Sequence, residues 1–123
     1  MKRRTDLYSV IESHEISGVL EAGSQFSGKL SFHGTLRIAG DFEGEIFTND
    51  ILVVGEGARV KAKIEAGTVI INGEVTGDIV AKNRVEINRP AIFRGSITTP
   101  SLLVAEGVIF EGSSKMVTTQ IPN

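Results

Sequence analysis

A five-residue pattern recurs six times along this chain and constrains its fold more than any other feature. Each copy runs apolar, polar, small, polar, apolar, except that the last copy ends on serine. The copies are Phe26–Leu30, Phe42–Ile46, Val60–Ile64, Val75–Ile79, Phe93–Ile97 and, more weakly, Phe110–Ser114. Their first residues lie 16, 18, 15, 18 and 17 positions apart. Strand-type alternation with so short a period predicts one coil of a β-solenoid per repeat.

A second apolar block lies between successive copies of the pattern. The blocks are Leu36–Ile38, Leu52–Val54, Val69–Ile71, Val85–Ile87 and Leu102–Val104. Segments containing glycine and asparagine connect blocks and patterns, and these residues accept the backbone angles of tight corners. The sequence therefore predicts an all-β fold, a right-handed parallel β-helix (solenoid) of about six coils of about 17 residues. We expect three short strands per coil and no capping helix.

Period-two alternation assigns a side to each residue of the repeat. In the second copy Phe42, Gly44 and Ile46 point inward, and the small glycine leaves room for its bulky neighbours. The polar residues point outward and stack into columns, one of which alternates in charge sign at each coil. That column contains Lys29, Glu45, Lys63 and Asp78. A slip by one coil would set like charges together, so the column favours a single register.

The outward column of the second block differs in character. It contains Arg37, Val53, Ile70, Glu86 and Leu103. An apolar patch is therefore expected around Val53 and Ile70. Either a tail of the same chain covers this patch, or the patch makes a lateral contact with another rod or with a membrane.

The repeat divides the chain into three parts. Residues 1–15 are expected to form a flexible N-terminal tail, residues 16–112 the β-helix core domain, and residues 113–123 a flexible C-terminal tail. The N-terminal tail combines basic residues with apolar residues at helical spacing, namely Lys2, Arg3, Arg4, Leu7, Val10 and Ile11. It is either a frayed tail or a weak membrane-binding foot, whose basic charges are balanced by acidic residues of the same tail.

Composition excludes several classes of function. The 123 residues contain no cysteine, which rules out disulfides, thiolate metal sites and a cysteine nucleophile. The net charge of −2 provides no basic field for nucleic acid. No apolar run approaches the roughly 18 residues that suggest a membrane span, and acidic residues interrupt the region where a secretory signal would lie. We therefore expect a cytoplasmic protein.

Two motifs look chemical but fit the repeat better. The stretch Gly23–Lys29 matches a phosphate-binding loop, yet Leu30 follows where serine or threonine would ligate magnesium, and the strand alternation continues. The two histidines, His14 and His33, have no further metal ligands at suitable spacing. The carboxylates lie in outward columns with lysine and arginine. We therefore expect no enzyme activity, no catalytic or metal site, and no cofactor or nucleotide.

Both ends of the predicted solenoid lack a cap, and an unpaired strand edge is a template for another chain. The C-terminal end carries Leu103, Val108, Ile109 and Phe110, together with Leu102 and Val104. The N-terminal end begins with Ile16, Val19, Leu20 and Phe26. We expect these residues to join copies of the chain end to end, so that the core continues through each joint without any nucleotide.

On these residues the chain resembles the bactofilins, bacterial polymer-forming cytoskeletal proteins. The resemblance runs from about Ile16 to Phe110. It rests on the order and spacing of Phe26–Ile46, Leu52–Ala58, Gly73–Ile79 and Pro90–Ala91.

The resemblance implies a roughly triangular, right-handed parallel β-helix. It also implies nucleotide-independent, non-polar filaments joined through their terminal coils. Such filaments would form a scaffold at the inner face of the cytoplasmic membrane, serving cell shape, wall synthesis or polar placement of partners. In the family an aromatic residue near the end of the helix lies in the C-terminal contact, and Phe110 is its best match here. The N-terminal tail of many members binds membrane.

Two other functions remain as alternatives. A hexapeptide-type acyltransferase forms a left-handed β-helix with an aliphatic residue at every sixth position, but steps of four and five interrupt that spacing here. A capped monomeric solenoid would instead offer one face to a binding partner. Light scattering separates that monomer from a polymer, because a capped monomer stays small at any concentration.

Overall fold

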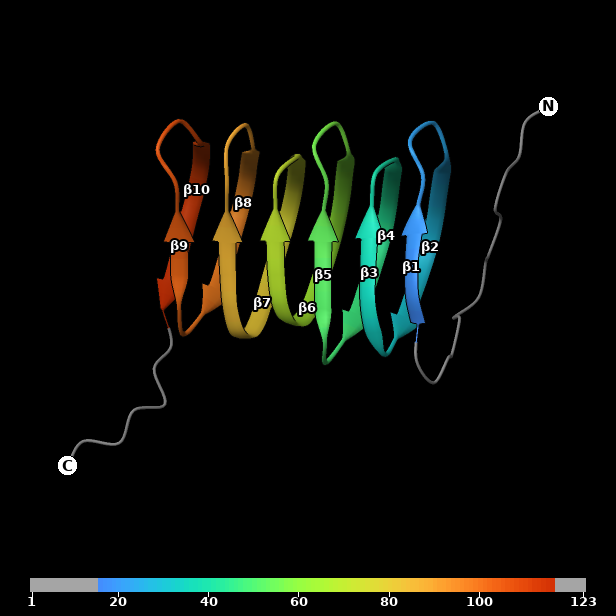
Figure 1. Ribbon diagram of the computed structural model, residues 1–123. Helices are drawn as coiled ribbons and strands as arrows, with labels where there is room; N and C mark the ends of the chain where they lie inside the picture. Colours follow the sequence, from blue (N-terminus) through green and yellow to red (C-terminus); the bar gives the residue numbers. More distant parts are fainter. Residues whose placement is uncertain (1–15, 117–123) are drawn as a thin grey trace.

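The structure, a computed structural model, describes residues 16–116, and every helix or strand assigned in this range is a β-strand (Figure 1). The strands are β1 (Ile16–Leu20), β2 (Gln25–Phe32), β3 (Gly34–Ile38), β4 (Asp41–Thr48), β5 (Ile51–Val54), β6 (Arg59–Ile71), β7 (Glu74–Ile87), β8 (Ile92–Thr99), β9 (Leu102–Val104) and β10 (Ile109–Met116). Their pairings are parallel, which confirms the predicted all-β solenoid.

Figure 1 shows how the chain winds. It rises along the near strands β1, β3, β5 and β9, crosses over the top and descends along the far strands, while it advances from the N-terminal end on the right to the C-terminal end on the left. This winding is right-handed, as predicted, and it is the hand that crossovers between parallel strands prefer.

The register follows the sequence repeat coil by coil. The first residues of the six copies are successive partners, namely Phe26, Phe42, Val60, Val75, Phe93 and Phe110. The second apolar blocks align in the same way from β3 through β5, β6 and β7 to β9, and β1 adds one strand before them. The unequal repeat lengths are therefore absorbed at the corners.

The strand layout differs from the expectation in two details. We expected three short strands per coil, but most coils contain two, and β6 and β7 are continuous strands of 13 and 14 residues. The backbone of these two strands stays extended around the corner, with a register irregularity between Ala66 and Thr68. The last strand also continues to Met116, past Gly112, where the sequence placed the end of the core.

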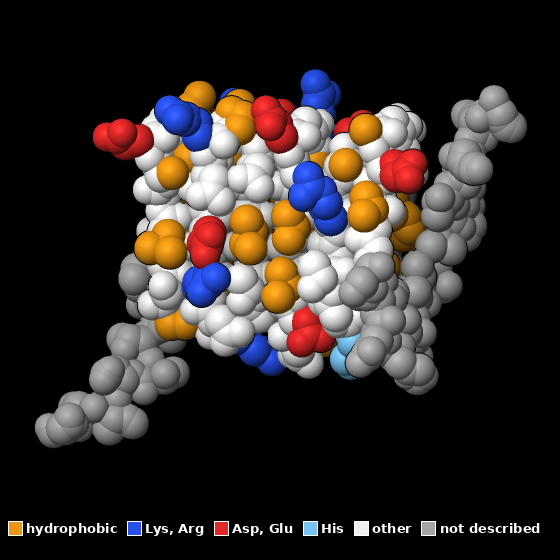
Figure 2. Space-filling view, viewed as in Figure 1, with side chains coloured by type: hydrophobic (Ala, Val, Ile, Leu, Met, Phe, Trp, Pro, Cys, Tyr) orange, Lys and Arg blue, Asp and Glu red, His pale blue; other side chains and the backbone are white. Residues whose placement is uncertain are grey.

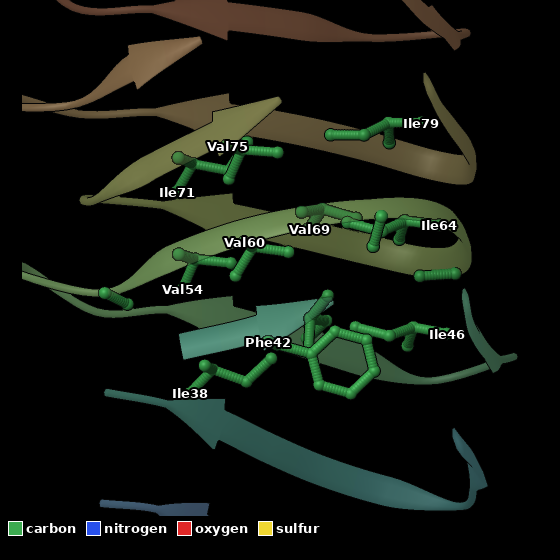
Figure 3. Packing of buried hydrophobic residues seen from close by; sticks show 14 of the residues in the cluster. Ile38, Phe42, Ile46, Val54, Val60, Ile64, Val69, Ile71, Val75 and Ile79 are labelled. Carbon is green, nitrogen blue, oxygen red and sulfur yellow. The ribbon is translucent and has the colours of Figure 1, made fainter. Parts of the chain in front are cut away.

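The core is a stack of aligned apolar columns. Figure 3 shows two of them, with Phe42, Val60 and Val75 in one and Ile46, Ile64 and Ile79 in the other. None of these six side chains is more than 2% exposed. Aromatic pairs lie near the ends of the stack, where the ring centroids of Phe26 and Phe42 are 5.0 Å apart and those of Phe93 and Phe110 are 5.3 Å apart. Cohesion therefore comes from one contact repeated between neighbouring coils.

A column of glycines runs between these two apolar columns, for a different reason from the one expected. It contains Gly28, Gly44, Gly77, Gly95 and Gly112, with Ala62 at the remaining coil. The five glycines have φ between 137° and 144°, which side chains with a Cβ rarely adopt. A Cβ on Gly77 would also overlap the carbonyl oxygen of Ala62 in the preceding coil. The backbone conformation and the close approach of the coils therefore require glycine, rather than the bulk of neighbouring side chains.

We expect Gly77→Ala to destabilise the solenoid strongly. The substitution adds backbone strain of about 1–3 kcal/mol. It also adds the overlap with the Ala62 carbonyl, which only a shift between coils could relieve. The total loss should reach at least ~3 kcal/mol, measured as a lower Tm in thermal unfolding followed by circular dichroism at fixed protein concentration.

Gly57→Ala is the matched control. Gly57 also has a positive φ, 89°, but no heavy atom outside this residue and its two chain neighbours lies within 4 Å of an added Cβ there. Only the strain of about 1–2 kcal/mol applies at this corner. Equal losses of stability in the two variants would show that the close approach of coils does not set the glycine requirement.

Candidate functional site

The motifs that look chemical in the sequence do not form a metal site within residues 16–116. Within this range no group of three or more histidine, cysteine, aspartate or glutamate side chains could hold a metal ion. The apparent phosphate-binding stretch runs into β2, with Gly28 and Lys29 inside the strand, whereas such a loop must open a helix. His33 is exposed between β2 and β3, and His14 lies outside the described residues. The right-handed winding (Figure 1) also differs from that of a hexapeptide-type acyltransferase.

None of the elements within residues 16–116 is a helix long and apolar enough to cross a bilayer.

The C-terminal end exposes residues of the interior columns. β9 and β10 each have a single neighbour within residues 16–116, so their outer edges carry unpaired backbone groups. Val104 follows the fully buried Ile87 in one column, yet it is 46% exposed. Leu102, Val108 and Phe110 are partly buried against the core. A further coil placed here would cover all of these side chains.

Two residues predicted for this end face sideways. Leu103 lies in an outward column and is 53% exposed. Ile109 is likewise exposed in an outward column. Val108 and Phe110, in contrast, pack against the interior stack. The candidate C-terminal contact therefore rests on Leu102, Val104, Val108 and Phe110.

The N-terminal end is less apolar than expected. Leu20 lies half-buried in an interior column, whereas Val19 lies in an outward column and is 55% exposed. Phe26 is only 5% exposed, so its ring is covered within the single chain instead of being presented to a partner. β1 begins at Ile16, whose side chain lies outside the described ones. The foot residues Lys2, Arg3, Arg4, Leu7, Val10 and Ile11 also lie outside the described residues.

The near face of the solenoid carries the apolar patch expected from the second block. Val53 and Ile70 are register partners and are both half-buried, and Ile51 adds an exposed side chain in the same strand as Val53. Figure 2 shows hydrophobic side chains at the centre of this face, between positive and negative groups. The column through the patch reads Val19, Arg37, Val53, Ile70, Glu86 and Leu103.

Two further apolar side chains were missed by the sequence reasoning. Phe47 and Val80 are exposed in one outward column, on either side of Glu65. The five-residue pattern ends one position before each of them, so it does not mark them. Continuing the same alternation by one residue identifies both as outward-facing.

The charges of the far face stack in the predicted register. The alternating column of Lys29, Glu45, Lys63 and Asp78 is a run of successive partners. Beside it, Arg94 joins three coils, because its Nη1 lies 3.3 Å from Glu74 Oε2 and its Nε lies 3.0 Å from Glu111 Oε1. These side chains are between 39% and 60% exposed, so each pair contributes little free energy. Together they connect the last coil to the two before it.

Comparison with known proteins identifies the family to which this solenoid belongs. A family profile described as "Bactofilin: Polymer-forming cytoskeletal" matches residues 18–115. The chain belongs to the bactofilin family.

Two curated bactofilins of Myxococcus xanthus (strain DK1622) are similar to this bactofilin. Bactofilin BacO is 35% identical over 98 residues, which cover 80% of this chain and 78% of that protein. Bactofilin BacP is 32% identical over 90 residues, which cover 73% of this chain but only 38% of that protein. No solved structure matches the chain.

The family assignment agrees with the resemblance found in the sequence. The matched residues 18–115 coincide almost completely with the solenoid between β1 and β10. Bactofilins are described as polymer-forming and cytoskeletal, which is a structural role.

Arg94→Ala is expected to loosen the last coil without unfolding the protein. Loss of the two ion pairs should cost less than about 1 kcal/mol at low ionic strength, and the cost should shrink as salt screens the charges. Hydrogen exchange of the β10 amides should become several-fold faster at low salt and approach that of the unmodified protein at high salt.

Arg84→Ala provides the control for this experiment. Arg84 Nε lies 2.8 Å from Glu86 Oε2, but both residues belong to β7, so their ion pair joins no separate coils. Exchange in β10 should not change. Equal acceleration by both variants would contradict a role for Arg94 in holding the last coil.

Proposed function

We propose that this bactofilin polymerises end to end through the terminal coils of its solenoid, without nucleotide, into non-polar filaments. These filaments act as a scaffold at the cytoplasmic membrane, for cell shape, wall synthesis or polar localisation of partners. The observation that carries the proposal is the C-terminal end, where an interior column reaches the open edge and leaves Val104 46% exposed.

The proposed joint uses the same kinds of interaction that hold the coils of the chain together. Within the chain, Phe93 packs on Phe110, and Val104 follows Ile87 in register. A coil of another copy beyond β9 and β10 would bury the exposed apolar surface and pair the free strand edges. Burying one side chain of this kind contributes about 1.5–3 kcal/mol. Such assembly needs only hydrophobic burial and backbone pairing, so nucleotide has no part in it.

Contacts between like ends would make the filament non-polar. An isologous contact places the same surface on both partners. The C-terminal end is apolar, so the C-terminal ends of two copies can pack against each other. A second isologous contact between N-terminal ends would continue the polymer. Protomers then alternate in direction, and the filament has no overall direction.

Phe110→Arg and Val104→Arg are each expected to leave a folded protein that does not form filaments. A guanidinium group in an interior column at the joint would have to be desolvated without a partner. In nucleotide-free buffer the unmodified protein should give strong light scattering and filaments in negative-stain electron microscopy. The critical concentration for polymerisation should rise roughly tenfold or more in both variants.

Leu103→Arg is the control for the end contact. Leu103 adjoins Val104 in β9 and is similarly exposed, at 53% against 46%, but it faces the lateral surface. Filaments should persist in this variant. Long filaments in Phe110→Arg and Val104→Arg would show that the end contact is misassigned, and an unmodified protein that stays monomeric would favour the capped binding module.

The N-terminal foot is the proposed link to the membrane. Basic side chains near an anionic surface contribute about 1 kcal/mol each, and three apolar residues add shallow insertion. A variant with Leu7, Val10 and Ile11 replaced by serine should lose flotation with vesicles that contain anionic lipid. Circular dichroism should show that its solenoid remains folded.

The near-face patch serves as the comparison in the flotation assay. The double variant Val53→Lys, Ile70→Lys should still float, because the proposed foot is intact. If the double lysine variant fails to float and the serine variant still floats, the membrane contact lies on the near face instead of the foot. Unmodified protein that fails to float would refute direct membrane binding.

A further inference from the structure

The central column of the near face has charges arranged symmetrically about an apolar centre. Along the solenoid axis it reads Val19, Arg37, Val53, Ile70, Glu86 and Leu103. Reversing this order exchanges the positions of Arg37 and Glu86 and leaves an apolar residue at each of the other positions. The column is therefore complementary to its own reverse.

We propose that this face docks against the same face of a second copy, with the two solenoid axes antiparallel. A two-fold axis that runs along the strands and passes between Val53 and Ile70 brings the two columns together in opposite order. Val53 then lies opposite the partner's Ile70. Arg37 lies opposite the partner's Glu86, and the symmetry forms this ion pair twice. Two charge pairs thus flank an apolar centre of four side chains.

Parallel docking is disfavoured by the same residues. With the axes parallel and the columns aligned, Arg37 would face the partner's Arg37, and Glu86 would face the partner's Glu86. Such like-charge contacts disfavour the parallel arrangement, whereas the attractive pairs favour the antiparallel one. The charges of the column therefore specify the orientation of the partner as well as contributing to its binding.

The neighbouring charged side chain is compatible with antiparallel docking. Arg84 pairs with Glu86 at 2.8 Å, and a carboxylate can accept hydrogen bonds from two arginines at once. Arg84 belongs to the adjacent column, in which Thr35, Ile51, Thr68 and Arg84 are successive partners. The two-fold operation sets Arg84 opposite the partner's Thr35, which carries no charge.

The shape of the face favours a contact along its length. The near strands run almost parallel in Figure 1, so the columns are straight rows. With coils about 4.8 Å apart, Arg37 and Glu86 are separated by about 14 Å along the axis, and a rigid partner can reach both. One such contact is small, but it recurs along a filament and gains from multivalency. Only this last step rests on the proposed polymerisation.

Engineered disulfides test the orientation directly, since the chain contains no cysteine. Full-length Arg37→Cys and Glu86→Cys proteins, carrying tags of different size, are mixed under mild oxidation. Antiparallel docking sets the two cysteines opposite each other and keeps the second Arg37–Glu86 pair of the interface intact. Non-reducing gels should show roughly tenfold more heterodimer than either homodimer. Adding Ile70→Lys to the Glu86→Cys protein should abolish the heterodimer.

Several outcomes would overturn the proposal. Lys61 lies on the far face, so cross-linking of the Arg37→Cys protein to a Lys61→Cys protein measures random collision. If the Arg37→Cys and Glu86→Cys proteins give no more heterodimer than this control pair, docking is refuted. Predominant Arg37→Cys homodimer would show parallel docking. A heterodimer that forms only after removal of residues 1–15 would assign the face to the chain's own tail, and one lost on addition of anionic vesicles would assign it to a membrane.

The cross-linking experiment also separates this proposal from the proposed function. Heterodimer formation does not require filaments. Heterodimer without filaments would contradict end-to-end polymerisation alone, whereas filaments without heterodimer would contradict antiparallel docking alone.

Discussion

The whole solenoid depends on the close stacking of parallel coils at the spacing of hydrogen-bonded strands, about 4.8 Å. The glycine column shows how strict this stacking is. At Gly77 the position of a Cβ is already taken by the carbonyl oxygen of the coil before it. Ala62, the one member of the column with a side chain, does not have the positive φ of the five glycines. Because every coil keeps this spacing, interior and surface residues share one register.

The same stacking explains why a polymer-forming family suits this fold. An interior coil is covered by a coil on each side, whereas a terminal coil is covered on one side only. In other respects the two kinds of coil have the same pattern of residues. Ile87 is fully buried because β9 covers it, and Val104 is exposed because no described strand covers β9. Capping such an end requires a distinct polar element. Another copy of the chain can supply the missing neighbour through the same apolar burial and backbone pairing.

Much of the fold could be predicted from the sequence because two periodicities determine it. The repeat length aligns coils, and the period of two assigns sides, so all six copies from Phe26 to Phe110 lie in the expected register. The cause of the glycine column could not be predicted. The sequence shows that a small residue recurs at this position, but it does not show the positive φ that requires glycine there. The continuity of β6 and β7 around a corner likewise depends on local backbone geometry.

The candidate end contacts were harder to predict because exposure at an end is a property of the tertiary structure. Phe26 is apolar and early in the repeat, but its ring is buried within the chain. Leu103 and Val104 are adjacent, similar in chemistry and similarly exposed. Only their register distinguishes them, because Val104 continues an interior column and Leu103 an outward one. Residue type marks an apolar end, and register decides which side chains a second coil would meet.

Opposite charges are separated by different numbers of coils on the far and near faces of the solenoid. This separation determines whether the charges act within one chain or between chains. On the far face Arg94 pairs with Glu111 in the next coil, so its charge acts within the chain and opposes a slip in register. On the near face Arg37 and Glu86 lie three coils apart, with Val53 and Ile70 between them. Opposite charges at the two ends of an apolar row give that row a direction. A partner that docks on this row must match its direction. Opposite charges in neighbouring coils therefore fix the register of the chain, whereas opposite charges several coils apart can select the orientation of a partner.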